Sequence, residues 1–101
     1  MNWVYLLSPA LDRRFLAAAD AATRAVIDAH GEYLDRLRAR GALVLAGRCW
    51  DGPYGIVILE APDREAAEAL VAADPSVASG IQRAELYEFD IPYPPVVVSS
   101  T

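Results

Sequence analysis

The order of two apolar spacings along this chain limits the folds that it can adopt. Residues 2–7 are mostly apolar or aromatic, as in a strand, and a helical period of about 3.6 residues follows over 20–40. Two further strand-like runs, 42–50 and 54–61, are separated by a short Asp-Gly-Pro turn. The first part of the chain is therefore predicted to fold as strand, helix, strand and strand.

The second half completes this order with one more helix and one more strand. Asp63 is a good helix N-cap, and the helical run that follows reaches Asp74. Pro75 disfavours helical geometry in the residue before it, so we expect the helix to end there. A short connection, 76–80, then leads to a strand at 81–90. The order βαββαβ predicts a ferredoxin-like α+β sandwich, with two helices on one face of a four-stranded antiparallel sheet.

The length of 101 residues is that of one small domain. We expect this domain to span 1–90, followed by a proline-rich tail or arm over 91–101 that is either extended or disordered. The pattern leaves 12–19 open between a short helical turn and a loop.

Both faces of the predicted sheet are apolar, and two helices can cover only one of them. In the first strand, Trp3, Tyr5 and Leu7 alternate with Val4 and Leu6. A strand with one face in water alternates apolar with polar residues instead. The hydrophobic content of 54% is also high for a small chain. We therefore expect a homodimer, or a higher homo-oligomer, that packs through the sheet face into a dimeric α+β barrel.

Charge and rare residues exclude several classes of protein. The net charge is −5, and the nine positive residues, all Arg, form no basic stripe, so we expect no nucleic-acid partner. No apolar run is long enough for a membrane span, and we expect no membrane partner. The absence of Lys excludes Schiff-base chemistry. With Cys49 as the only cysteine and one histidine, we expect a cytoplasmic protein with no disulfide, no metal site and no cofactor.

His30, the only histidine, falls inside the apolar stripe of the first helix and is expected to point toward the sheet. One interpretation is a core histidine that is hydrogen-bonded to a backbone carbonyl. The other is a pair with Asp74, because both helices pack on the same sheet face and their inner edges can meet. Asp74 is otherwise a solvated Asp-Pro turn. A carboxylate beside His30 would hold the ring in one tautomer and poise it as an acid or base.

An ordered series of residues connects these two positions with a known family. Its members are His30, Tyr33, Leu34, Leu37, Gly41, Ala46-Gly47, Ala73-Asp74-Pro75 and Gly80. This series resembles the YCII-related family of small dimeric α+β barrel proteins, within the muconolactone-isomerase-like superfamily, over about 2–90. The resemblance implies a ferredoxin-like fold, a homodimer or larger assembly, and a pocket around a His–Asp dyad, here His30 and Asp74. A few relatives look like dehydrochlorinases or muconolactone-isomerase-like enzymes. The chain departs from the pattern at Gly47-Arg48, where many relatives have Gly-Pro, and in a longer segment before His30.

Four other side chains are candidates for a small-molecule ligand site. Arg48 could bind the carboxylate of a small acid with both guanidinium nitrogens, or it could be an exposed residue at a strand end. Trp50, Tyr5 and Tyr33 could line a pocket for an aromatic ligand, or they could pack in the core or the dimer contact. Cys49 has no activating neighbour in sequence and is interpreted as a small apolar filler.

The leading hypothesis is a cofactor-independent enzyme of the lyase or isomerase type, acting on a small cyclic or aromatic acid, lactone or phenol. His30 would transfer the proton, Asp74 would orient His30, and Arg48 would hold an anionic group of the substrate. Two alternatives stay open. One is a non-catalytic metabolite-binding or accessory dimeric module, and the other is a cofactor-free oxygenase of an activated phenol.

Overall fold

The computed structural model describes residues 1–9, 21–52 and 54–96, and the undecided segment at 12–19 lies outside these ranges. The described chain forms four strands and three helices. They are β1 (Asn2–Pro9), α2 (Ala21–Ala39), β2 (Leu43–Arg48), β3 (Gly55–Glu60), α3 (Arg64–Ala72), α4 (Pro75–Ala78) and β4 (Gln82–Glu88).

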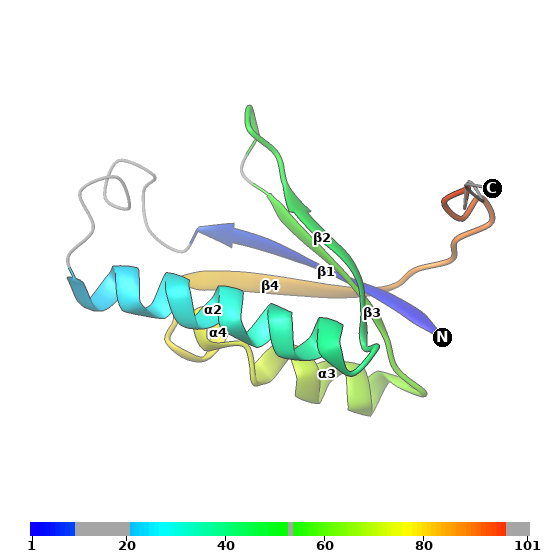
Figure 1. The fold of residues 1–101 in the computed structure, drawn as a ribbon, viewed down its shortest axis with the longest axis horizontal. Coiled ribbons are helices and arrows are strands. Elements are labelled where there is room, and N and C mark those ends of the chain that lie inside the picture. Colours follow the sequence, from blue (N-terminus) through cyan, green and yellow to red (C-terminus); the bar gives the residue numbers. More distant parts are fainter. Residues whose placement is uncertain (10–20, 53, 97–101) are drawn as a thin grey trace, which may run out of the picture.

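The four strands form one antiparallel sheet in the order β2-β3-β1-β4. The helices lie together on one side of it, with α2 running the length of the sheet and α3 and α4 beside it (Figure 1). This arrangement confirms the predicted ferredoxin-like α+β fold. The strand order makes β1 and β3 the two central strands of the sheet.

The end of α2 and the start of α3 have the capping residues that the sequence predicts. Gly41 follows α2 with a φ of +77°, which a glycine adopts without strain. The amides of Gly41 and Ala42 donate to the carbonyls of Arg38 and Leu37, which closes the helix in a Schellman motif. At the start of α3, the carboxylate of Asp63 accepts a hydrogen bond of 2.8 Å from the amide of Ala66.

The predicted connection at 76–80 is the main correction to the secondary structure. Most of it belongs to α4, a helix of four residues for which Asp74 is the N-cap and Pro75 the first residue. Proline fits this position because the first amide of a helix has no partner within the helix. The Asp-Pro pair therefore begins a second helix as well as following α3.

The core lies between the sheet and the helices. Every other residue of β1 points into it, and Trp3 also donates a hydrogen bond of 3.1 Å from Nε1 to the carbonyl of Ala61. Its buried members are Trp3, Tyr5, Leu7, Tyr33, Leu37, Val57, Leu59, Ala61, Ala67 and Val71.

The opposite sheet face is apolar as well. Val4 and Leu6 of β1 lie beside Ile58 and Ile56 of β3, on the side away from the helices. On the edge strand β2, Leu45 pairs with Ile58 after an irregularity in the register and is 45% exposed. No described helix packs on this face of the sheet.

The second, third and fourth strands are shorter in the structure than the sequence predicts. Cys49 and Trp50, which were expected in the second strand, follow β2. In the tail, residues 91–96 form neither helix nor strand and expose Tyr93 and Val96, while 97–101 lie outside the described residues. Among the described helices, none is both long and apolar enough to cross a membrane.

Candidate active site

Asp74 is buried completely where α3 ends and α4 begins. Its Oδ1 accepts hydrogen bonds of 2.9 Å from both the amide and the hydroxyl of Ser76. Its Oδ2 accepts one of 2.9 Å from the hydroxyl of Tyr5 on β1. The Nδ1 atom of His30 lies 2.8 Å from each carboxylate oxygen. The carboxylate is thus held by groups from three separate segments of the chain.

These hydrogen bonds determine the charge of Asp74. Burial by itself raises the pKa of a carboxyl group, because it disfavours the ionised form. Here the hydrogen bonds from His30, Ser76 and Tyr5 outweigh burial and lower the pKa of Asp74 below its ordinary value of 3.8. Asp74 is therefore a carboxylate at neutral pH. In the hydrogen bond between the two side chains, His30 must be the donor.

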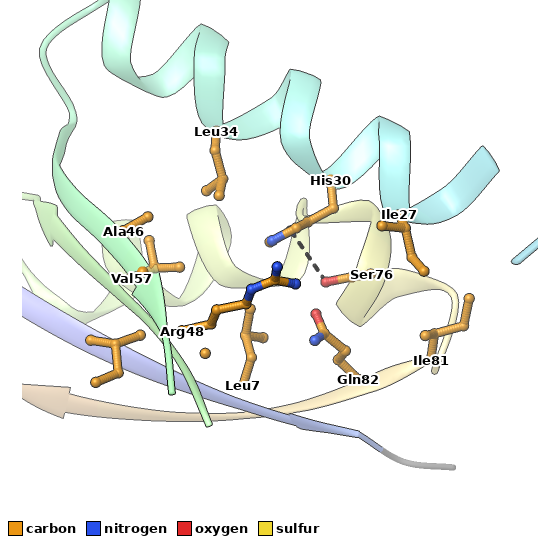
Figure 2. Close-up of a pocket in the computed structure, with 13 residues that line it drawn as sticks. Leu7, Ile27, His30, Leu34, Ala46, Arg48, Val57, Ser76, Ile81 and Gln82 are labelled. Atoms are coloured by element: carbon orange, nitrogen blue, oxygen red, sulfur yellow. Dashed lines mark hydrogen bonds between the residues drawn. The ribbon is translucent and has the colours of Figure 1, made fainter. Parts of the chain in front are cut away.

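His30 lies on α2 with its side chain 20% exposed. Since the ionised Asp74 can only accept, Nδ1 of His30 carries a hydrogen and the neutral ring has its lone pair on Nε2. Nε2 faces the pocket and makes no hydrogen bond with any other described residue (Figure 2). One nitrogen of the ring is therefore fixed by the protein, and the other is available to a ligand.

The pocket in front of this nitrogen has a volume of about 520 Å³ and lies between α2 and the sheet. Such a volume suits a small organic molecule. Four of its residues are polar: His30, Arg48, Ser76 and Gln82. The rest of the wall is apolar or glycine, and consists of Leu7, Ile27, Leu34, Ala46, Gly47, Gly55, Ile56, Val57 and Ile81.

Arg48 brings a positive charge to the pocket from the end of β2. It pairs with Gly55 of β3, on the side of the sheet that faces the helices, and its side chain points into the pocket (Figure 2). The guanidinium carbon lies 4.2 Å from the centre of the Trp50 ring. No carboxylate among the described residues forms an ion pair with Arg48. Arg48 is thus an exposed residue at the strand end, as one of the two interpretations expected, and its guanidinium lies against Trp50 without an ion pair to the described protein.

The three aromatic candidates lie outside the pocket wall. Trp50 is 80% exposed and lies against the guanidinium of Arg48. Tyr5 is completely buried behind Asp74, and Tyr33 is buried in the core, where its hydroxyl donates to the carbonyl of Leu70. Burial, together with the charge of Asp74, raises the pKa of both tyrosines above its ordinary value. His30 thus contacts Asp74 and lines the same pocket as Arg48, and the hydroxyl of Tyr5 donates a hydrogen bond to Asp74.

Sequence reasoning missed Ser76 and Gln82. Ser76 follows Asp-Pro, and its position as the second residue of a helix capped by Asp74 could have been inferred from that motif. Gln82 shares a strand face with Ala84 and Leu86, and a polar residue on an otherwise apolar face is also a readable signal. Cys49, by contrast, is a half-buried free thiol that does not line the pocket.

The fold and the pocket define a small ferredoxin-like α+β protein with a buried histidine–carboxylate pair. The model of the YCII-related domain family matches residues 4–90, so the chain belongs to the YCII-related family. It is 37% identical over 62 residues to YjpA of Bacillus subtilis (strain 168), an uncharacterized protein; this match covers 61% of the chain and 73% of YjpA.

A solved structure of the same fold has a ligand bound. It is 5-chloro-2-hydroxyhydroquinone dehydrochlorinase (TftG) from Burkholderia phenoliruptrix AC1100, in complex with 2,5-dihydroxybenzoquinone. The two structures match with a TM-score of 0.68 over 89% of this chain and 94% of the other, at 16% sequence identity. At this identity the likeness shows a common fold.

Proposed function

We propose that the protein is a cofactor-independent enzyme of the lyase or isomerase type, acting on a small cyclic or aromatic acid, lactone or phenol. The observation that carries this proposal is the two-sided environment of His30. Asp74 binds Nδ1, and Nε2 faces a pocket that can hold such a molecule. His30 and Asp74 are the proposed catalytic pair.

The chemistry follows from the tautomer. Nε2 accepts a proton from carbon or from a hydroxyl of the substrate, and the carboxylate of Asp74 stabilises the imidazolium that forms. Return of this proton to a different carbon completes an isomerisation. In an elimination, the electron pair of the broken C–H bond forms a C=C bond, and the leaving group departs with the electron pair of its own bond to carbon. The proton then passes from Nε2 to solvent. Neither reaction consumes an oxidant or a reductant.

Two further observations support a reaction on a ring. The walls of the pocket are mainly apolar, with the polar residues confined to a few positions. The structural neighbour TftG is a dehydrochlorinase and is bound to a hydroxylated quinone. The non-catalytic alternative predicted instead a His30 ring capped by a backbone carbonyl or a filled pocket. The hydrogen bond from Nδ1 to Asp74 favours the enzyme.

Proton exchange tests this proposal without prior choice of one substrate. Hydroxyquinols, chlorinated hydroquinones, cyclic enols and unsaturated lactones are incubated with the protein in D₂O, and NMR follows deuterium entry at carbon and any release of chloride. At least one compound is expected to react, and His30→Gln to lower the rate by about 100-fold or more. Exchange that persists in His30→Gln, or its absence throughout this panel, would contradict the proposed role of His30.

We also propose that two copies pack through the open sheet face. Val4, Leu6, Ile56 and Ile58 point to that side and are buried or half-buried in the single chain, while Leu45 and Tyr87 beside them are 45% and 49% exposed. An apolar face of this kind is stabilised by burial against a second copy of itself. Light scattering after gel filtration is expected to give the mass of a dimer or larger assembly, and Leu6→Arg to give a monomer. Glu68→Arg on the exposed side of α3 is the matched control and is expected to leave the mass of the assembly unchanged.

A further inference from the structure

Gln82, the first residue of β4, carries a hydrogen-bond acceptor that the described protein does not use. Ala84 and Leu86, on the same face of the strand, pack against the core. Gln82 instead lines the pocket, and Figure 2 shows its amide pointing into the space below Ser76. Its Oε1 is buried and accepts no hydrogen bond from any described residue.

An acceptor in this state is costly for the folded protein. A buried oxygen that has lost its water and gained no partner destabilises the structure, and native proteins contain few of them. A leucine or methionine would fill the same position on this strand face without that cost. The presence of a glutamine at this position is explained if a ligand in the pocket donates a hydrogen bond to Oε1.

Arg48 supplies the complementary feature. Its guanidinium also points into the pocket, is oriented by the ring of Trp50, and has no carboxylate partner among the described residues. A guanidinium in this state favours an anionic oxygen. The pocket thus offers a ligand one cation and two unused acceptors, Oε1 of Gln82 and the lone pair of His30 Nε2.

We propose that Gln82 is a specificity-determining residue, which selects ligands that carry a hydroxyl group as well as an anionic oxygen. Oε1 of Gln82 accepts from the hydroxyl, Arg48 binds the anionic oxygen, and the apolar walls hold the ring between them. The ligand class is therefore a small hydroxylated ring anion. This inference rests on the proposed function, because it assigns the substrate class of the same pocket.

Binding of matched benzoates tests the inference without turnover. Isothermal titration calorimetry compares 2-, 3- and 4-hydroxybenzoate with the fluorobenzoate of the same substitution, since fluorine is small and cannot donate a hydrogen bond. For at least one isomer, the hydroxy compound is expected to bind about tenfold more tightly to the wild-type protein. In Gln82→Leu this preference is expected to fall to within about twofold.

Three further variants separate the possible causes. Gln82→Met repeats the loss of the amide with a different shape and is expected to behave as Gln82→Leu does. Arg48→Met is expected to lower the preference for hydroxybenzoate over the matching hydroxybenzamide by about tenfold, and to keep the preference for hydroxyl over fluorine. In the His30→Gln background, Gln82→Leu is still expected to lower the preference for hydroxyl over fluorine, so failure of the proposed reaction and failure of this inference give different results.

Several outcomes would overturn the inference. They are the absence of binding by every benzoate, equal binding of hydroxy and fluoro compounds to the wild-type protein, and survival of the preference in both Gln82 variants. The Gln82 variants could also lose affinity for the hydroxy and fluoro compounds by the same factor, while circular dichroism shows an intact fold. In that case Gln82 shapes the pocket and does not recognise a hydroxyl. That result overturns the inference as well.

Discussion

The two sides of the His30 ring differ in how their polar groups are satisfied. Behind the ring, the carboxylate of Asp74 accepts hydrogen bonds from Tyr5, Ser76 and His30 and is completely buried. In front of it, His30 Nε2 and Gln82 Oε1 have no hydrogen-bond partner among the described residues, and Arg48 has no carboxylate partner there. A satisfied network stabilises the fold, whereas unsatisfied groups in a pocket are available to a ligand. Substitutions behind the ring should therefore lower stability, and substitutions in front should lower binding or turnover.

Asp74→Ala is expected to have the largest effect on stability. It removes the common acceptor of the Tyr5 hydroxyl, the Ser76 amide and hydroxyl, and His30 Nδ1, and Tyr5 and Ser76 are themselves buried. Loss of one member of a buried charged network costs about 3–5 kcal/mol of unfolding free energy. Urea denaturation followed by circular dichroism measures this loss.

Asp74→Asn is the matched control, because the amide oxygen still accepts hydrogen bonds while the charge is removed. Its loss of stability should be clearly smaller than that of Asp74→Ala. If both variants unfold at the wild-type urea concentration, the network behind His30 does not stabilise the fold, and the contrast between the two sides of the ring is lost.

Acid should reduce the contribution of Asp74 to stability. The pKa of this carboxyl is lowered in the folded protein, so the unfolded chain takes up the proton first as the pH falls. The contribution is thus complete above the ordinary value of 3.8 and is lost as the pH falls through the lower folded value. The difference in urea midpoint between the wild-type protein and Asp74→Asn should stay constant from pH 7 to about pH 4 and shrink as the pH falls further. Other carboxyl groups are common to both proteins and cancel in this difference, so a gap that stays constant below this pH would contradict the assignment.

Tyr5→Phe should lower stability less than Asp74→Ala, because it removes one of the hydrogen bonds to the carboxylate and keeps the buried ring. The expected loss is about 1 kcal/mol at neutral pH. Burial and the charge of Asp74 raise the pKa of the Tyr5 hydroxyl in the folded protein. The stabilisation is therefore present below the ordinary value of 10.0 and declines as the pH rises above it, since the unfolded chain ionises first. Urea midpoints at alkaline pH should fall more for the wild-type protein than for Tyr5→Phe.

The sequence predicts the side behind the ring better than the side in front, for a physical reason. Helical period places His30 on the inner face of α2, and the Asp-Pro pair places Asp74 at a helix end, so both positions follow from local rules. The contact between them depends on how α2 crosses α4, which local rules leave open. The sequence left Tyr5 open between the pocket wall and the core or dimer contact, because an aromatic residue suits any of these places. Only the register of β1 against β3 and β4 shows that its hydroxyl reaches Asp74.

Gln82→Leu is expected to have the smallest effect on stability, and its sign gives the sharpest test of the contrast. The amide oxygen makes no hydrogen bond with the described protein, so its removal breaks no hydrogen bond. The leucine also adds apolar surface to a wall that includes Ile81 and Leu7. The unfolding free energy should stay unchanged or rise by up to about 1 kcal/mol, in contrast to the losses expected for Asp74→Ala and Tyr5→Phe. A loss of more than about 1 kcal/mol would show that Gln82 supports the fold. In that case the polar groups in front of His30 would be structural, as those behind it are, and the two sides of the ring would no longer differ in role.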